Sequence, residues 1–180
     1  MVGAAAVVAA AVLSSGGGVA DRPPFVRSQS FTLPAVDAGQ AAVSLAAAPG
    51  RPVVLTFFAA WCQPCTRELP VIERWYRSLP AAGPGTPTVV GVDELDQRPD
   101  GPDLVHQAGV TFASGYDHDG TVGRSWAVDG LPVTAFVTAA GRVVAYHRGE
   151  LDQTQLDRLV HRLEAADQGP QAAGQPPEEQ

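Results

Sequence analysis

The pentapeptide Trp61-Cys62-Gln63-Pro64-Cys65 constrains the fold more than any other stretch, because it contains both cysteines of the chain and lies between two different patterns. Residues 52–60, PVVLTFFAA, have the β-branched and aromatic content of a buried strand, and a helical pattern begins at Gln63. Cys62 is therefore predicted at a helix N-terminus. There the unpaired backbone N–H groups and the helix dipole favour a thiolate and lower the thiol pKa.

The cysteine pair has two other readings, a structural disulfide and half of a zinc site. A disulfide across two intervening residues closes so short a loop that it adds little stability. A closed zinc site needs four ligands, and this chain has no second cysteine pair. Its four histidines are scattered without ligand spacing: His106, His118, His147 and His161. A redox-active dithiol is the favoured interpretation.

Length and charge limit the classes of partner. A chain of 180 residues can bury one substantial core with tails, whereas two domains would be small. The net charge is −7, all basic residues are arginines, and none of them form a stripe. We therefore expect no nucleic-acid partner, and we expect a monomer.

The first 20 residues carry no charge and include a continuous apolar run from Val2 to Leu13. This run suits a secretory signal, and Gly18-Val19-Ala20 offers small residues for signal cleavage. No basic residue precedes the run, and residues 14–18 would poorly complete the ~20 apolar residues that span a bilayer. We expect residues 1–20 to be a cleaved signal peptide or an N-terminal anchor, which places the domain outside the cytoplasmic membrane. The alternative is a cytoplasmic protein with an Ala-rich start.

The remaining chain predicts one α/β domain over residues 29–166, between a Pro-containing linker at 21–28 and a disordered tail at 167–180. A weak hairpin is expected from residues 30–33 and 41–45. Further strands are expected at 52–58, 88–92, 133–138 and 142–148, an extended piece at 110–115, and helices at 63–79, 103–108, 119–127 and 152–166. This order predicts a central mixed sheet flanked by helices on both faces, with an N-terminal hairpin extension.

Two of these helices have clear inward faces. In the first, Leu69, Ile72, Trp75 or Tyr76, and Leu79 recur at spacings of three and four, so Trp75 is expected in the core. Pro70 lies inside this pattern and predicts a kink. In the last helix the inward residues are Leu156, Leu159, Val160 and Leu163.

From Ser30 to Glu164 the chain resembles the thioredoxin-fold thiol-disulfide oxidoreductases of the TlpA/ResA/CcmG type. The resemblance rests on SFTLPAVDAG, VVLTFFAAWCQPC, Pro70, VVGVDELD and GLPVTAFVTAAGRVVAYHRG. It implies a thioredoxin-like fold and an exported protein-disulfide oxidoreductase.

The resemblance also implies roles for individual residues. Cys62 would be the attacking thiol and Cys65 the buried resolving thiol. Pro132 would be the cis-proline opposite the disulfide, with Leu131 presenting its backbone to a substrate strand. Without the resemblance, an ordinary trans bond would be expected there. Supporting positions beside the thiols fall on Trp61 and Pro64.

The chain departs from thioredoxin six residues before Cys62. Thioredoxins bury an aspartate there that takes the proton of the resolving thiol, and this chain has Thr56, which cannot ionise. Another acid is needed, and the resemblance indicates the segment after Val92. The candidates are Asp93, Glu94 and Asp96, with Glu94 and Asp96 as the expected modulators. Each has the alternative reading of a solvated acidic loop. A carboxylate near the thiols would raise the pKa of Cys62 and oppose the helix dipole.

The resemblance implies reduction of disulfides in exported proteins, as in cytochrome c maturation, with a membrane electron donor and no cofactor beyond the Cys62–Cys65 disulfide. A disulfide-forming oxidase would differ only in reduction potential.

Two other classes remain. Thiol peroxidases carry Pro-x-x-x-Thr-x-x-Cys, and this chain has Leu55 and Ala59 at the two diagnostic positions. A copper-binding module would use both thiolates with a histidine such as His147, but related copper carriers space their cysteines by three residues rather than two.

Overall fold

The central strand of the molecule is β3, Val53–Phe58, as the sequence predicts. All six of its residues are buried, because both faces of the sheet are covered. The structure, a computed structural model, describes residues 23–46, 49–80, 83 and 85–169. The predicted signal segment and residues 170–180 of the predicted tail lie outside these ranges.

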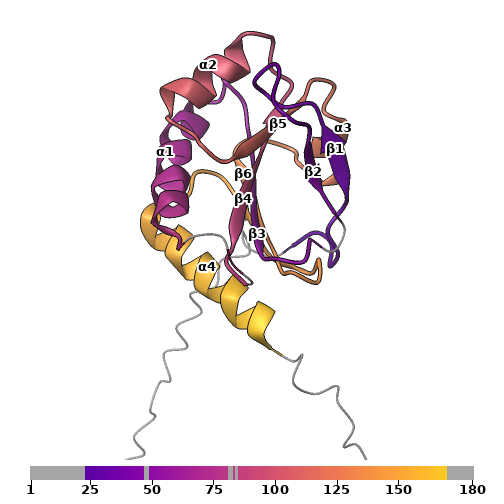
Figure 1. The fold of residues 1–180 in the computed structure, drawn as a ribbon, viewed down its shortest axis with the longest axis vertical. Helices are drawn as coiled ribbons and strands as arrows, with labels where there is room; N and C mark the ends of the chain where they lie inside the picture. The colour runs from indigo at the N-terminus through magenta and orange to yellow at the C-terminus, as the bar shows by residue number, and fades with distance from the viewer. Residues whose placement is uncertain (1–22, 47–48, 81–82, 84, 170–180) are drawn as a thin grey trace, which may run out of the picture.

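Five strands form the main sheet in the order β5-β4-β3-β6-β7 (Figure 1). β4 (Thr88–Glu94) pairs in parallel with β3 and with β5 (Ala113–Asp117). β6 (Val133–Val137) pairs antiparallel with β3, and β7 (Val143–Arg148) forms a hairpin with β6. A separate antiparallel pair, β1 (Phe31–Leu33) and β2 (Val43–Leu45), is the predicted N-terminal hairpin. The mixed thioredoxin-like sheet is thereby confirmed.

Helices cover the sheet unequally. α1 (Gln63–Ser78), α2 (Asp100–Gln107) and α4 (Gln153–Gln168) lie over one face, whereas α3 (Thr121–Ser125) and the hairpin lie over the other (Figure 1). Within the described residues, no helix is both long and apolar enough to cross a bilayer.

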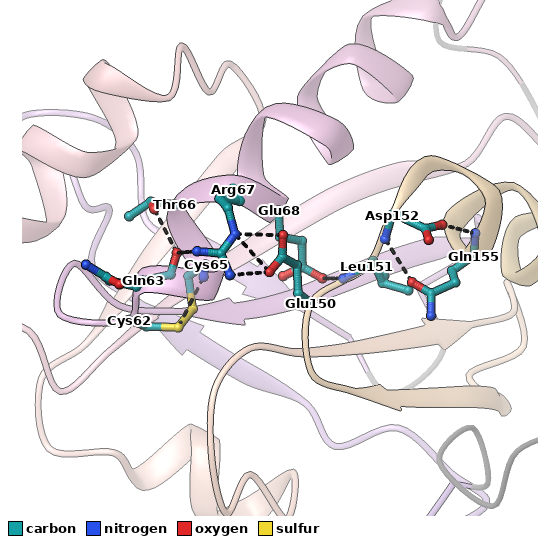
Figure 2. Close-up of polar contacts among 10 residues, drawn as sticks. All are labelled: Cys62, Gln63, Cys65, Thr66, Arg67, Glu68, Glu150, Leu151, Asp152 and Gln155. Carbon is teal, nitrogen blue, oxygen red and sulfur yellow. Dashed lines mark hydrogen bonds and ion pairs between the residues drawn. A yellow bond between two sulfur atoms is a disulfide. The ribbon is translucent and has the colours of Figure 1, made fainter.

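The predicted inward faces are confirmed. Leu69, Ile72 and Trp75 of α1 are buried, and α1 continues through Pro70. The four predicted residues of α4 are also buried. α4 begins with a capping box between Asp152 and Gln155, which satisfies two N-terminal donors (Figure 2).

The boundary error that matters most for the site concerns β4, which the sequence predicted to end at Val92. It continues through Asp93 and Glu94, which pair with Tyr116 and Asp117 of β5. The apolar run stops before the strand does, because backbone pairing does not require apolar side chains. β5 also lies three residues later than the predicted extended piece, and α2 begins three residues earlier than predicted.

Candidate active site

Cys62 is the N-cap of α1, at the point where β3 delivers the chain to the helix. Its sulfur accepts a hydrogen bond from the backbone N–H of Cys65 at 3.2 Å. The first turn contains no acidic residue, and Pro64 occupies a position where no backbone donor is needed. Helix N–H groups and the dipole therefore favour a negatively charged sulfur at Cys62.

Cys62 and Cys65 form a disulfide with an S–S distance of 2.03 Å (Figure 2). Cys65 is completely buried and Cys62 nearly so. The neighbouring Trp61 is 62% exposed and marks the surface next to the disulfide. A substrate approaching the sulfur pair would meet the Trp61 side of the helix N-terminus first.

The Leu131–Pro132 peptide bond is cis, as the resemblance implied. Leu131 lines a pocket together with Trp61, although the two residues are 70 positions apart. The structure thus brings the loop before β6 to the same surface as the cysteine motif. Pro132 itself is buried, and its carbonyl accepts a hydrogen bond from the N–H of Gly149 at 2.9 Å.

The three acids after Val92 are buried, so their reading as a solvated acidic loop is wrong. Asp93 and Glu94 belong to β4, and Asp96 follows it. Because β5 and helices α2 and α3 pack around the end of β4, the side chains there turn into the protein. Two glycines make room: a Cβ at Gly101 would lie 1.9 Å from Asp93 Oδ2, and one at Gly123 would lie 2.2 Å from Glu94 Oε1.

Asp96 is the acid that contacts the active-site backbone. Its Oδ2 accepts a hydrogen bond from the N–H of Ala60 at 2.6 Å, two residues before Cys62. Burial, followed by the hydrogen bond and charge of Asp96, raises the pKa of Asp93 to about 9. The raised pKa favours the neutral, protonated form of Asp93 at neutral pH, whereas Asp96 fixes the turn leading to Cys62 through the N–H of Ala60.

Glu94 faces the other way, toward the pocket that contains Trp61 and Leu131. Burial, then the charge of Asp117, raises the pKa of Glu94 to about 7, against the opposing charge of Arg124. Among the described residues, no hydrogen bond joins Glu94 or Asp96 to a cysteine sulfur, so their role as modulators of the thiols stays a prediction.

Sequence reasoning missed another buried acid near the cysteines, Glu68, which lies one helical turn after Cys65. Its Oε1 accepts a hydrogen bond from the N–H of Leu151 at 3.2 Å (Figure 2). The hydroxyl of Thr134 lies 3.4 Å from the same oxygen. The same hydroxyl lies 3.4 Å from that of Thr56. Helix α1 thus brings a carboxyl group toward the strand position where thioredoxins have their aspartate.

Burial raises the pKa of Glu68 to about 8, although the hydrogen bonds from Leu151 and Thr134 oppose the shift. The signal was available in the sequence, because residues three positions apart share a helix face. Glu68 follows Cys65 by three and precedes the inward Leu69 by one.

A surface ion pair lies next to Glu68 in the sequence and in space. The guanidinium of Arg67 lies 3.0 Å from Glu150, in the segment that leads to α4 (Figure 2). This pair connects the first turn of α1 to the residue before Leu151, the donor to Glu68.

Across the described ranges, no group of three or more His, Cys, Asp or Glu side chains could hold a metal ion.

Comparison with known protein families shows that residues 27–146 match the AhpC/TSA family. The chain is 27% identical over 146 residues to the thiol:disulfide interchange protein DsbE of Xylella fastidiosa, covering 80% of this chain and 71% of that protein. It is 24% identical over 114 residues to the thiol-disulfide oxidoreductase ResA of Bacillus thuringiensis, covering 63% of this chain and 64% of that protein.

Among solved structures, a secreted disulfide oxidoreductase of Mycobacterium tuberculosis, homologous to E. coli DsbE, aligns with a TM-score of 0.62 and 25% identity. The alignment covers 75% of this chain and 95% of that protein. The range matched by the family, residues 27–146, includes the cysteine motif and the loop before β6.

Proposed function

Since the chain belongs to the AhpC/TSA family and its homologues are named thiol-disulfide oxidoreductases, we propose that it reduces disulfides of exported proteins through Cys62 and Cys65. The observation that carries the proposal is the sulfur of Cys62 at the N-terminus of α1, accepting the N–H of Cys65. This environment stabilises a thiolate, the form that attacks disulfides.

The reaction begins with the reduced protein. The Cys62 thiolate attacks one sulfur of a substrate disulfide, forms a mixed disulfide and releases the other substrate sulfur as a thiolate. Cys65 then loses its proton and attacks Cys62, which releases the second substrate thiolate and closes the Cys62–Cys65 disulfide. Two electrons pass to the substrate, and a membrane donor must return two electrons to the protein. No other cofactor is required.

Two buried acids support these steps in different ways. Glu68, one turn from Cys65 and with a pKa of about 8, is placed to accept the proton that Cys65 loses when it attacks. Asp96 holds the N–H of Ala60 and so positions the turn that carries Cys62. Trp61 and Leu131 line the surface on which the substrate segment lies. Pro64 lies in the first turn of α1, and the buried Pro132 follows Leu131.

We place the activity outside the cytoplasmic membrane, with the protein secreted or anchored. The apolar run from Val2 to Leu13 and the secreted Mycobacterium tuberculosis relative support this location. The DsbE and ResA relatives support exported proteins as substrates, with cytochrome c maturation as one setting.

Trapping tests the exchange reaction. In the variant Cys65→Ser the mixed disulfide cannot be resolved, so covalent complexes with substrate proteins should accumulate in cells and disappear on treatment with a reductant. The matched control is the double variant Cys62→Ser/Cys65→Ser, which should trap nothing. If Cys65→Ser forms no complexes while Cys62 remains open to alkylation, the exchange mechanism is wrong.

A further inference from the structure

A pocket of about 220 Å³ lies beside the disulfide, between the cysteine motif and the loop before β6. We call it the Glu94 pocket; its walls include Trp61, Leu95, Val128 and Leu131, with Glu94 and Asp129 as its charged residues. Leu95 is 47% exposed, and it and Trp61 are two of the three large hydrophobic side chains that are exposed in the described part of the chain. Leu95 also has a φ of 59°, which is rare for a branched side chain. Two exposed apolar side chains therefore flank this single pocket.

Glu94 is the buried acid of this pocket; the charge of Arg124 acts on it, but no hydrogen bond or ion pair joins the two side chains among the described residues. Glu94 is 6% exposed, and its Oε2 is buried without a hydrogen-bond partner among the described residues. Gly123, which packs against the Glu94 carboxyl group, donates its N–H to Asp117 Oδ2 at 2.9 Å. Buried polar groups in native proteins almost always have a partner, so an unpartnered one that lines a pocket beside a reactive centre indicates a ligand.

The lining identifies the chemistry of that ligand. Apolar walls with carboxyl groups at the charged positions match a side chain with an aliphatic stem and a cationic head, as in lysine and arginine. An acidic side chain would be repelled, and an apolar one would leave Glu94 unpaired. Asp129 is partly engaged already, because Arg148 Nε lies 3.4 Å from its Oδ1. Glu94 is the carboxyl group left for an incoming cation.

The opposite side of Trp61 offers a contrast. A wider pocket of about 380 Å³ there includes Asp100 and Asp103, and both of these acids are exposed to water. Exposed carboxylates keep their hydration and attract cations weakly, although they add to the negative field around the disulfide. Selectivity is therefore expected from Glu94 and not from Asp103.

We propose that the Glu94 pocket binds a lysine or arginine side chain next to the reacting cysteine of the substrate, with Glu94 as the specificity-determining residue. The inference rests on the proposed function, because it names the substrate class of the same reaction. It selects, among disulfide-bearing proteins, those with a basic residue flanking the disulfide.

The test uses synthetic disulfide peptides that are identical except for one residue flanking the reacting cysteine: lysine, methionine or glutamate, placed on either side. The second-order rate constant for reduction by the reduced protein is measured for each peptide. The lysine peptide should react roughly tenfold faster than the methionine peptide, because a hydrogen bond to a charged group forms only with lysine. The glutamate peptide should be the slowest.

The decisive quantity is the lysine-to-methionine rate ratio within each variant, which a partial loss of folding or of basal activity does not change. In Glu94→Gln the ratio should fall to about one, whereas Asp103→Asn, which removes the same charge on the other side of Trp61, should keep most of it. A ratio near one in the unmodified protein, or a ratio retained in Glu94→Gln, overturns the inference while the proposed function stands. If the unmodified protein reduces none of the peptides, the proposed function fails and the inference fails with it.

Discussion

Glu68 and Glu94 are both buried carboxyl groups near the disulfide, and burial raises the pKa of each. Their surroundings differ. Glu68 lies inside the protein between α1 and the start of α4, where Leu151 N–H donates to it. Glu94 lies at the end of β4 against a pocket, and each of the two acids has an Oε2 that is buried without a hydrogen-bond partner among the described residues. Burial alone therefore does not define the role of an acid. Glu68 contributes to packing between α1 and the segment before α4, whereas Glu94 is available to a substrate in the pocket.

The largest expected difference between the two acids is in stability. Glu68→Ala leaves Leu151 N–H without its acceptor and opens a cavity in the core, so the free energy of unfolding should fall by about 3 kcal/mol. Glu94→Ala removes a group that has an unpartnered oxygen beside a pocket, and the loss should stay below about 1 kcal/mol. Urea unfolding of the oxidised proteins measures both values. Equal losses would contradict the distinction.

A smaller effect follows from pH. A carboxyl group whose pKa is higher in the folded protein binds its proton more tightly when folded. The stability it contributes is complete below the unfolded pKa of 4.5 and is lost as pH rises through the folded pKa. The oxidised protein should therefore become steadily less stable as the pH rises from 5 to 9. Its cysteines, joined as a disulfide, do not titrate.

The two acids should act in different pH windows. In Glu94→Gln, the part of the stability loss that Glu94 causes up to about pH 7 should disappear. In Glu68→Gln, the part that Glu68 causes up to about pH 8 should disappear. Asp93, with a pKa of about 9, supplies the remaining slope in both variants. Unfolding at a series of pH values provides the measurement. A stability that stays flat over this range would show that these carboxyl groups are already ionised in the folded protein at pH 5.

Most of the fold was predictable because its signals are local. The apolar run of β3, the helical spacing of Leu69 and Ile72, and the turn between β6 and β7 each specify an element without reference to the rest of the chain. The position of Cys62 at a helix N-terminus followed from the same local patterns. Family resemblance supplied what spacing could not, namely the cis bond at Leu131–Pro132.

The acids were harder to place because their burial depends on packing between distant elements. Asp93 and Glu94 are accommodated by Gly101 and Gly123, and no local pattern links these positions. Glu68 is buried because Leu151, 83 residues later, supplies its donor. From the sequence alone, a charged residue next to an apolar stripe is expected to be exposed to water. Its burial can be predicted only when the group that neutralises it or hydrogen-bonds to it is known.

Equilibration with glutathione tests the central claim, reduction of substrate disulfides by the Cys62–Cys65 pair, most directly. The protein is incubated at a series of ratios of reduced to oxidised glutathione, and the fraction of Cys62–Cys65 disulfide is measured by alkylation. A reductant requires a potential at or below about −200 mV, in the range of reducing thioredoxin-fold proteins. A potential near about −120 mV, typical of a strong oxidase, would contradict the account and assign the protein to disulfide formation.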